Sequence, residues 1–248
     1  MNNRINKAIS IMQGAWIDFS STAKGNPFFL LIPFTYPIAL LFVMYLNTGT
    51  RYLGLLLVGA ILAEIINAGT AVFSETGSSK LFFKTFDLYV ASPTSPFVYC
   101  MTISASWILM NSLAIFLFLL LALYFTHAGL LAVIATILIA IETSMVLGFI
   151  AFSAGTRLKT ERDVFALGTI LSFGLTLLSP IYYPITVLPP FVQMLSFLFP
   201  STGPAILLQW AFGILNVNSN LVILSIANIL VYLIIGIVAV KTALWREE

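Results

Sequence analysis

Two carboxylates lie within long apolar stretches of the chain, and their chemistry sets the first constraint on function. Glu64 and Glu142 would each cost about 2.5–3.5 kcal/mol to place, ionised, near the centre of a bilayer, so each side chain is expected to face protein or water. The helical face of Glu64 also carries Asn67 and small residues that allow a second helix to approach closely, namely Ala60, Ala63, Ala68 and Ala71. We favour structural hydrogen bonding for both acids; a role for either as a proton site on a transport route is the alternative.

No residue pattern for catalysis or nucleotide hydrolysis accompanies these acids. The chain lacks the GxxxxGK[ST] loop that cradles phosphate, the HExxH zinc motif and the GxSxG nucleophile motif. Its single histidine, His127, is predicted to be an interfacial residue, and its single cysteine, Cys100, can form neither an intrachain disulfide nor a thiolate cluster. We therefore predict that the chain is not an enzyme, holds no cofactor or metal, and shows no ATPase activity when purified alone.

The composition indicates that the elements holding these residues are membrane-spanning helices. Of the 248 residues, 60% are hydrophobic and only 8% are charged, against roughly 25% charged in a typical soluble domain. A bilayer core about 30 Å thick requires about 20 apolar residues per helix, so the sequence predicts an all-α integral membrane protein with one domain, 1–248, and six transmembrane helices. The predicted spans are residues 28–47, 52–73, 96–125, 130–153, 164–183 and 221–244.

The residues before the first span and the distribution of positive charge indicate how the chain sits in the membrane. In residues 1–26, apolar side chains recur at helical spacing among charged ones, which predicts an amphipathic helix in the membrane interface. Positively charged loops stay in the cytoplasm, and of the eleven Lys and Arg residues only Arg51 falls on the outer side of a six-span topology. Both termini are therefore predicted to be cytoplasmic, in the cell membrane. The scattered positive charges do not indicate binding of nucleic acid.

Residues 74–95 form the longest charged connection between predicted spans, and they fall on the cytoplasmic side. A short helix capped by Ser78 or Ser79 would place three aromatic side chains on one face, at i, i+4 and i+7: Phe82, Phe86 and Tyr89. We predict that this face contacts a cytoplasmic partner, with Glu75 and Lys84 contributing to the same contact. An amphipathic loop resting on the lipid headgroups is the alternative.

Between the last two predicted spans, residues 184–212 are hydrophobic but rich in proline. Proline lacks an amide hydrogen and clashes with the preceding helical turn, so the prolines in and just before this region prevent one straight helix. They are Pro180, Pro184, Pro189, Pro190, Pro200 and Pro204. Non-helical backbone at membrane depth survives only when it is buried in protein or lines a wet cavity. We therefore predict short re-entrant helices that dip from the outer face; a hydrophobic loop lying on the bilayer surface is the alternative.

Three features together resemble the permease subunits of the type-2 ABC transporter family: the amphipathic amino-terminal helix, the ETG...SPTSP segment and the PIYYPITVLPPFVQMLSFLFPSTGPAILL region. The resemblance extends over nearly the whole chain. It implies a homodimer, or a dimer with a similar permease, bound to two cytoplasmic ABC ATPase subunits that would hold ATP and Mg. It also implies that residues 75–95 form the coupling helix and its flanks, and that residues 189–209 form outer helices that gate the exit.

The sequence thus favours the transmembrane permease subunit of an ATP-driven ABC exporter that moves an amphipathic, lipid-linked or drug-like substrate out of the cytoplasm. Spans that are rich in aromatic residues and carry no Lys or Arg away from their ends suit such a cargo better than a small anion. Two alternatives from other classes stay open: a proton-coupled secondary transporter that uses Glu64 or Glu142, and a membrane scaffold that transports nothing.

Overall fold

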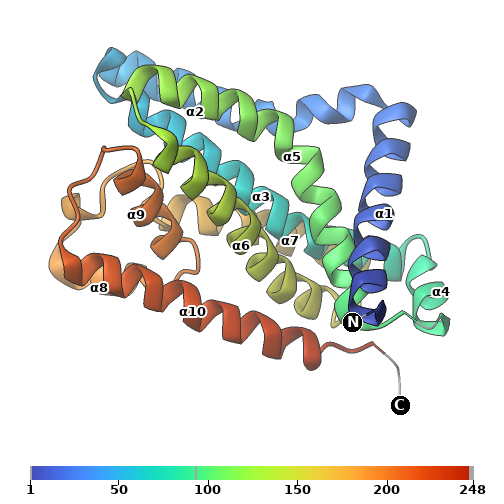
Figure 1. Cartoon of the computed structure of the whole chain (residues 1–248). Helices are drawn as coiled ribbons and strands as arrows, with labels where there is room; N and C mark the ends of the chain where they lie inside the picture. The colour runs from blue at the N-terminus through green and yellow to red at the C-terminus, as the bar shows by residue number, and fades with distance from the viewer. Residues whose placement is uncertain (1, 93, 246–248) are drawn as a thin grey trace.

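The computed structural model describes residues 2–92 and 94–245 as a set of helices packed side by side (Figure 1). Pro93, in the predicted coupling segment, and Arg246, counted among the cytoplasmic cations, lie outside these residues. No strand occurs in the described part of the chain, so the prediction of an all-α fold is confirmed. The α-helices are α1 (Asn2–Gly25), α2 (Ile32–Thr48), α3 (Leu53–Leu81), α4 (Thr85–Ala91), α5 (Pro96–Thr126), α6 (Leu130–Gly155), α7 (Glu161–Leu178), α8 (Pro190–Ser196), α9 (Thr202–Ala211) and α10 (Ser219–Lys241). Three short 3-10 helices connect them: η1 (Pro27–Leu31), η2 (Gly49–Tyr52) and η3 (Ile185–Val187).

The helix α3 forms the centre of the bundle, because it is apolar around most of its circumference and contacts α5, α6 and α7. Glycine allows a close approach between α3 and α6. A Cβ atom on Gly69 would lie 2.6 Å from the Cβ of Leu147 and 2.9 Å from the carbonyl oxygen of Ser144, both on α6. Small residues at such crossings let helices pack backbone to backbone in a membrane, so the α3–α6 contact depends on the absence of a side chain at this position.

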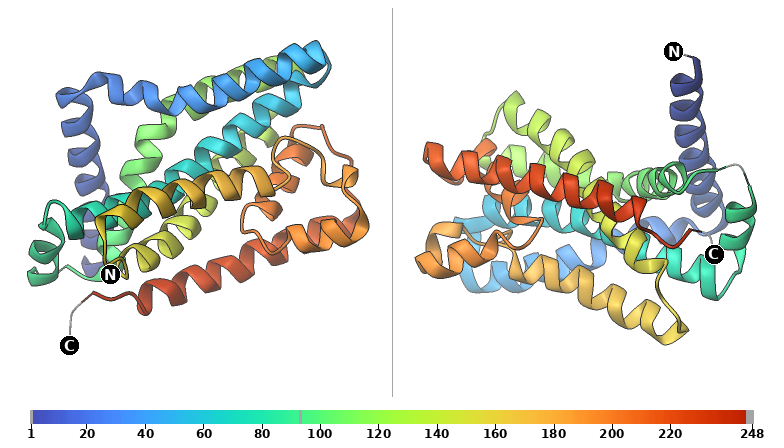
Figure 2. Two further views of the ribbon diagram at one scale, coloured as in Figure 1. Left: turned by 180° about the vertical axis from the view of Figure 1, so that it is seen from behind. Right: turned by 90° about the horizontal axis from the view of Figure 1, so that it is seen from below.

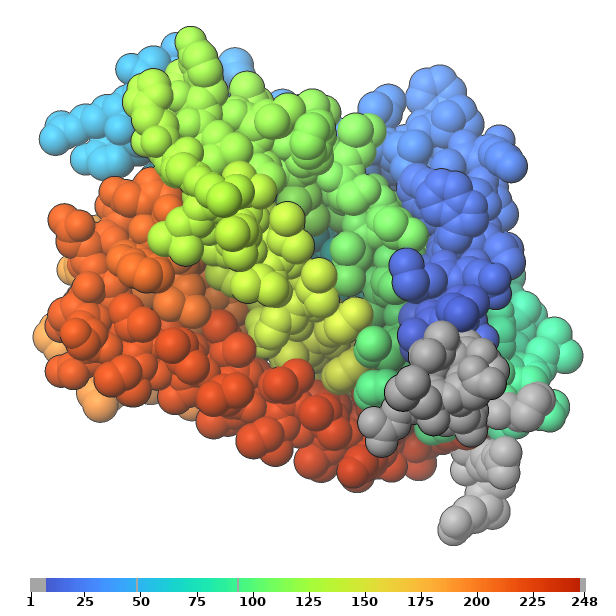
Figure 3. All heavy atoms as spheres, viewed as in Figure 1, coloured from blue at the N-terminus to red at the C-terminus, as the bar shows by residue number. Residues whose placement is uncertain are grey.

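Five helical segments are long and apolar enough to cross a membrane: Pro27–Asn47, Gly49–Leu81, Pro96–Thr126, Leu130–Gly155 and Ser219–Lys241. Many large apolar side chains on α2, α5, α6 and α10 are exposed on the surface of the chain, as they are in helices that face lipid. Figure 3 shows α10 running along one edge of the molecule with its outer face uncovered. These features fit a multi-pass helical membrane protein.

The predicted fifth span corresponds to α7, which is shorter than the five segments above. It has 18 residues, begins with the charged sequence Glu161-Arg162-Asp163 and ends at Leu178, because Pro180 follows closely and cannot continue a helix. The helix nevertheless runs beside α3 along the length of the bundle (Figure 2). The sixth crossing of the membrane stays a prediction.

The bundle has two distinct ends, which Figures 1 and 2 both show. The start of α1 and the helix α4 lie at one end, called the α4 end below. Trp245 lies there too, because its ring contacts that of Phe86 on α4. The 3-10 helix η2, the turn between α5 and α6, and α8 lie at the opposite end, called the α8 end. The two ends of the described chain therefore lie on the same side of the bundle.

The amino-terminal helix α1 stands at a steep angle to α10 and packs along α5 (Figure 2). Its inner face is fixed by two contacts: Gly14 lies against Thr102, and the Ser106 hydroxyl donates a hydrogen bond of 2.5 Å to the Asp18 carboxylate. Four large apolar side chains of α1 are exposed: Ile9, Met12, Trp16 and Ile17. The amphipathic helix predicted for residues 1–26 is thus present over Asn2–Gly25, and its place at a membrane interface stays a prediction.

The boundary between α3 and α4 differs from the sequence-based prediction. We expected the second span to end near residue 73 and a new helix to begin after Ser78 or Ser79, but α3 continues to Leu81. Gly77 explains the difference, because the missing side chain lets Leu158 and Val164 pack directly against this last part of α3. The chain then turns at Lys84, whose φ of 57° is left-handed, and α4 begins at Thr85.

The proline-rich region forms two short helices, α8 and α9, instead of one long one. Pro190 occupies the first turn of α8, where its missing amide hydrogen does no harm, and Pro200 lies in the turn between the two helices. Pro184 precedes η3, and Pro189 is the residue before the first turn of α8. The prediction that proline divides this region is confirmed, whereas its re-entry from the outer face of a membrane stays a prediction.

Candidate functional site: a polar pocket between four helices

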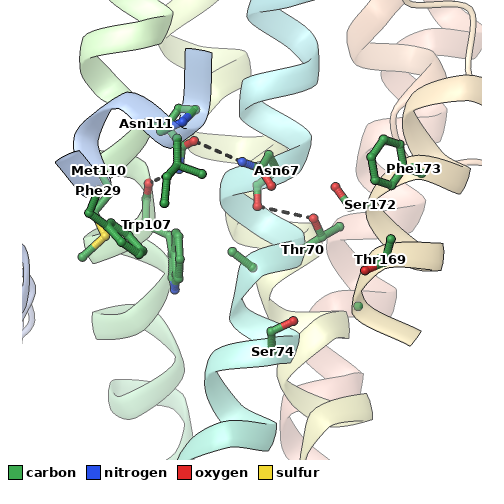
Figure 4. Close-up of a pocket in the computed structure, with 14 residues that line it drawn as sticks. Phe29, Asn67, Thr70, Ser74, Trp107, Met110, Asn111, Thr169, Ser172 and Phe173 are labelled. Carbon is green, nitrogen blue, oxygen red and sulfur yellow. Dashed lines mark hydrogen bonds between the residues drawn. The ribbon is translucent and has the colours of Figure 1, made fainter. Parts of the chain in front are cut away.

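A pocket of about 370 Å³ opens between η1 and α2 on one side and α3, α5 and α7 on the others (Figure 4). Most of its polar wall comes from amide and hydroxyl side chains at the middle of long apolar helices. The polar lining residues are Asn67, Thr70, Ser74, Asn111, Thr169 and Ser172. Polar residues at membrane depth are costly unless they face protein or a water-filled cavity, so this wall marks the pocket as the first candidate for function.

Hydrogen bonds fix the orientation of the two asparagines. The Asn67 amide donates to the Asn111 Oδ1 at 3.4 Å, and the Asn111 amide donates to the backbone oxygen of Trp107 at 2.7 Å. Thr70 donates to the carbonyl oxygen of Ile66 within α3 at 2.9 Å. Figure 4 shows these side chains on facing helices, with Asn67 and Asn111 directed toward each other. The α3–α5 side of the pocket is therefore held in place before any ligand enters.

Aromatic side chains and one glycine shape the rest of the pocket. Phe29 and Trp107 lie with their ring centroids 6.1 Å apart, and Phe173 meets Tyr36 edge-on at 4.9 Å. Gly168 brings α7 close to α3, since a Cβ atom there would lie only 2.4 Å from the Ser74 hydroxyl oxygen. The pocket thus combines aromatic walls with neutral hydrogen-bonding groups.

The chemistry that these residues offer is hydrogen bonding to neutral groups beside aromatic surface. No titratable side chain lines the pocket, and residues 2–92 and 94–245 contain no group of three or more His, Cys, Asp or Glu side chains placed to hold a metal ion. Aromatic surface together with a few convergent neutral donors and acceptors is typical of a site for an amphipathic small molecule. An uncharged part of such a molecule would fit this lining best.

Glu64 lies behind the wall of the pocket. Its side chain is only 2% exposed, and the Asn67 side chain is its polar neighbour one helical turn further along α3. Its second carboxyl oxygen, Oε2, has no hydrogen-bonding partner in the described part of the chain. The prediction that Glu64 faces protein is confirmed, and Asn67 links it to Asn111 across the α3–α5 contact.

Glu142 lies on α6, whose described residues do not line the pocket. It is half-buried, and the Thr143 hydroxyl donates to its Oε2 at 3.0 Å. The structure therefore does not bring the two intramembrane acids together at this site, and their functional roles stay predictions.

We expect Glu64→Gln to leave thermal stability nearly unchanged, because glutamine keeps an acceptor and adds donors beside Asn67. Glu64→Leu should lower the thermal stability more than Glu64→Gln does, because leucine offers no polar group to the Asn67 amide in this buried setting. A buried polar group that loses a partner costs about 1–3 kcal/mol. Thermal unfolding of the two variants in the same detergent measures the difference. If glutamine abolishes proton-dependent transport in vesicles while the chain stays folded, the structural role is wrong and the secondary-transporter alternative gains.

The residues predicted to couple to a partner are separated by the structure. Phe86 is buried, only 4% exposed, against Tyr99 and Trp245, with ring centroids 6.0 and 5.3 Å away. Phe82 lies before α4 and packs on Phe165. The predicted shared face of Phe82, Phe86 and Tyr89 is therefore wrong, because the helix begins three residues after Phe82 and turns Phe86 inward.

The other predicted coupling residues lie in different settings. Glu75 is half-buried within α3, where Ser79 donates to it at 3.5 Å. Lys84 and Tyr89 are exposed at the α4 end. Two further side chains, Phe83 and Leu88, are each 71% exposed there, although sequence reasoning did not single them out. The coupling of the predicted residues to a partner stays a prediction.

Sequence reasoning also missed the polar side chains that hold the α8–α9 region. The Asn228 amide donates to the backbone oxygen of Phe197 at 2.8 Å, and its Oδ1 accepts from the Gly203 amide at 3.1 Å. Tyr232 donates to the backbone oxygen of Leu198. An asparagine within the apolar run of α10 was the available signal, since the rule that drew attention to Glu64 and Glu142 applies to amide side chains as well.

A scan against protein-family models finds no match to this chain, and a search of curated proteins finds no significant match either.

Proposed function

We propose that this chain is the membrane-spanning permease subunit of an ATP-driven exporter, in which the α4 end receives a cytoplasmic ABC ATPase subunit and the polar pocket forms part of the substrate route. The observation that carries the proposal is the exposed apolar surface at the α4 end, formed by Phe83, Leu88 and Tyr89. These side chains lie beside exposed charges from Lys84 and Asp87. Apolar and aromatic residues within a polar rim are typical of a protein interface.

The turn before α4 supports a contact with a rigid partner. Lys84 adopts a left-handed backbone conformation, which is unusual for a residue other than glycine and holds α4 at a fixed angle to α3. Beneath α4, Phe86 anchors the helix to the bundle through Tyr99 and Trp245. A force applied to the exposed side of α4 would therefore pass directly to α3 and α5.

The polar pocket supports a route for substrate rather than a passive scaffold. Its neutral amide and hydroxyl groups belong to helices that would cross the membrane in this proposal, where polar side chains are expected to face protein or a water-filled cavity. A second copy of the permease placed against α2 and α7 would enclose the pocket. An amphipathic, lipid-linked or drug-like cargo would use both its aromatic walls and its hydrogen-bonding groups.

The remaining features of the proposal concern topology. The α4 end would be cytoplasmic, as the distribution of Lys and Arg predicts. The helix α7 would then provide the sixth crossing, continued by the buried residues 179–182. At the opposite, outer face, α8 and α9 would be the re-entrant helices, with Pro184, Pro189, Pro190 and Pro200 setting their ends.

Partner retention tests the proposal. We expect the double variant Phe83→Ala/Leu88→Ala to reduce co-purification of an ABC ATPase subunit at least tenfold, because truncating central interface residues typically costs about 2 kcal/mol or more in binding. The permease should stay folded, since both side chains project away from the bundle. The measurement is the ratio of ATPase subunit to permease after affinity purification from membranes.

A control variant removes one exposed leucine side chain from α10, away from the α4 end. Leu230 on α10 is exposed, so Leu230→Ala should leave partner retention unchanged. Equal retention by the Phe83/Leu88 variant and the Leu230 control would contradict the proposal and favour an α4 that rests on lipid headgroups. If the wild-type chain retains no ABC ATPase subunit, the proposed function itself is contradicted.

A further inference from the structure

Arg51 forms no ion pair with any acidic residue in the part of the chain that the structure describes. Among the nine Asp and Glu residues of the chain, none occurs in residues 19–63, 88–141 or 164–246, which include every loop at the α8 end. The guanidinium lies over the ring of Tyr52, 5.5 Å from its centroid. Arg51 thus carries a positive charge at the α8 end without a carboxylate from the described chain to neutralise it.

This charge lies at the edge of a separate pocket of about 380 Å³. Four segments that are distant in sequence converge on it: η2 with the start of α3, the end of α5, the residue before η3, and the turn after α9. Thr50, Arg51 and Tyr52 supply the polar edge, whereas Phe125 and Phe212 supply apolar wall. The turn after α9 passes through Gly213, whose φ of 68° favours glycine.

The combination of a lone guanidinium and an apolar wall selects a particular ligand. A guanidinium presents a planar fork of hydrogen-bond donors that matches the oxygens of a phosphate group. It is also more weakly hydrated than an ammonium group, so it costs less to desolvate. The stacked Tyr52 ring holds this fork in place at an energetic gain. Phe125 offers an exposed apolar surface for hydrocarbon beside it. A free inorganic anion would use the first feature only, whereas a phosphate carried on an apolar chain would use both.

We infer that the pocket beside Arg51 binds the phosphate group of an amphipathic lipid at the α8 end of the bundle. The inference is independent of ATP-driven export, because it holds equally for a bilayer lipid that stabilises this end and for a lipid-linked cargo that leaves there. It assigns to Arg51 the neutralising partner that the chain does not provide.

Direct titration tests this site on the full-length chain in a neutral maltoside detergent. The probe is dodecyl phosphate, and its binding is followed by calorimetry for wild type, Arg51→Gln and Arg51→Lys. We expect Arg51→Gln to weaken binding at least tenfold, and Arg51→Lys to retain part of the affinity because lysine keeps the charge without the planar fork. Tyr52→Leu should weaken binding less than Arg51→Gln does, since it removes only the support of the guanidinium.

Two controls make the outcome decisive. Lys159→Gln removes an exposed cation elsewhere on the chain and should leave the affinity for dodecyl phosphate unchanged. Inorganic phosphate at the same concentration should fail to displace the probe, because it lacks the apolar chain. Unchanged binding by Arg51→Gln, equal weakening by Lys159→Gln, or full displacement by inorganic phosphate would each overturn the inference.

Discussion

Replacing Trp245 with alanine is expected to lower the free energy of unfolding by about 3–5 kcal/mol, the range measured when large aromatic side chains are truncated in a protein core. Trp245 is 8% exposed, and its ring lies 5.3 Å from those of Phe86 and Tyr99 and 6.1 Å from that of Phe152. It therefore joins α4, α5 and α6 at one point. The loss should release α4 first, because Phe86 is the buried anchor of that short helix.

Thermal unfolding in detergent measures the stability, and trypsin cleavage at Lys84, in the exposed turn before α4, measures the local release. We expect faster cleavage in Trp245→Ala than in wild type under native conditions. Trp245→Phe is the matched control: the indole nitrogen has no hydrogen-bonding partner in the described part of the chain, so phenylalanine loses only contact area. Identical melting and cleavage of the alanine variant and wild type would show that the aromatic cluster does not hold α4.

Hydrogen bonds between side chains and the backbone hold the segment that carries Trp245. The Leu244 amide donates to the Thr156 hydroxyl at 3.2 Å, and the Arg157 guanidinium donates to the carbonyl oxygen of Thr242 at 2.6 Å. Lys80 at the end of α3 donates to the carbonyl oxygen of Thr156 at 2.7 Å. These contacts tie the end of α10 to the α6–α7 turn and to α3. Any movement of α4 would therefore be shared among several helices.

Hydropathy predicted the long helices well, because a helix needs an apolar run of sufficient length to cross a membrane. Helices buried in the protein interior need the same kind of run. The proline positions likewise predicted the division between α8 and α9, since proline acts on its own backbone. By contrast, the end of α3 depends on Gly77 packing against Leu158 and Val164, which are distant in sequence. No local pattern around Ser78 carries that information, so the helix was predicted to end too early.

The candidate site was predictable only in part for the same reason. Glu64 and Asn67 stand out in an apolar run, and their burial follows from the cost of charge in lipid. The pocket itself requires Asn111, Ser172 and the close approach at Gly168, and sequence periodicity does not show which faces of α3, α5 and α7 meet. The inward turn of Phe86 has a similar origin, because its partner Trp245 lies far along the chain.

The second large effect is expected at Gln209, whose side chain is fully buried in α9. Its amide nitrogen donates to the carbonyl oxygen of Pro180 at 2.8 Å and lies 3.4 Å from those of Ile181 and Tyr183. These carbonyls belong to the non-helical segment after α7, where no regular helix satisfies them. Gln209→Leu would leave them without this donor, at about 1–3 kcal/mol for each buried acceptor that loses its partner.

We therefore expect Gln209→Leu to lower the free energy of unfolding by at least about 2 kcal/mol and to loosen the segment after α7. Gln209→Glu should be at least as harmful, because an ionised carboxylate has nearly the same shape but offers acceptors where the carbonyls need a donor. Gln193→Leu provides the comparison: its amide also donates to one carbonyl, that of Leu188 at 2.8 Å, but it is only half-buried, so water can replace it. Thermal unfolding gives the stabilities, and labelling of a cysteine introduced at Tyr183 reports local opening. If Gln209→Leu and Gln193→Leu melt together and label at equal rates, the amide of Gln209 does not fix this segment, and packing by Ile181 and Tyr182 against α3 must hold it instead.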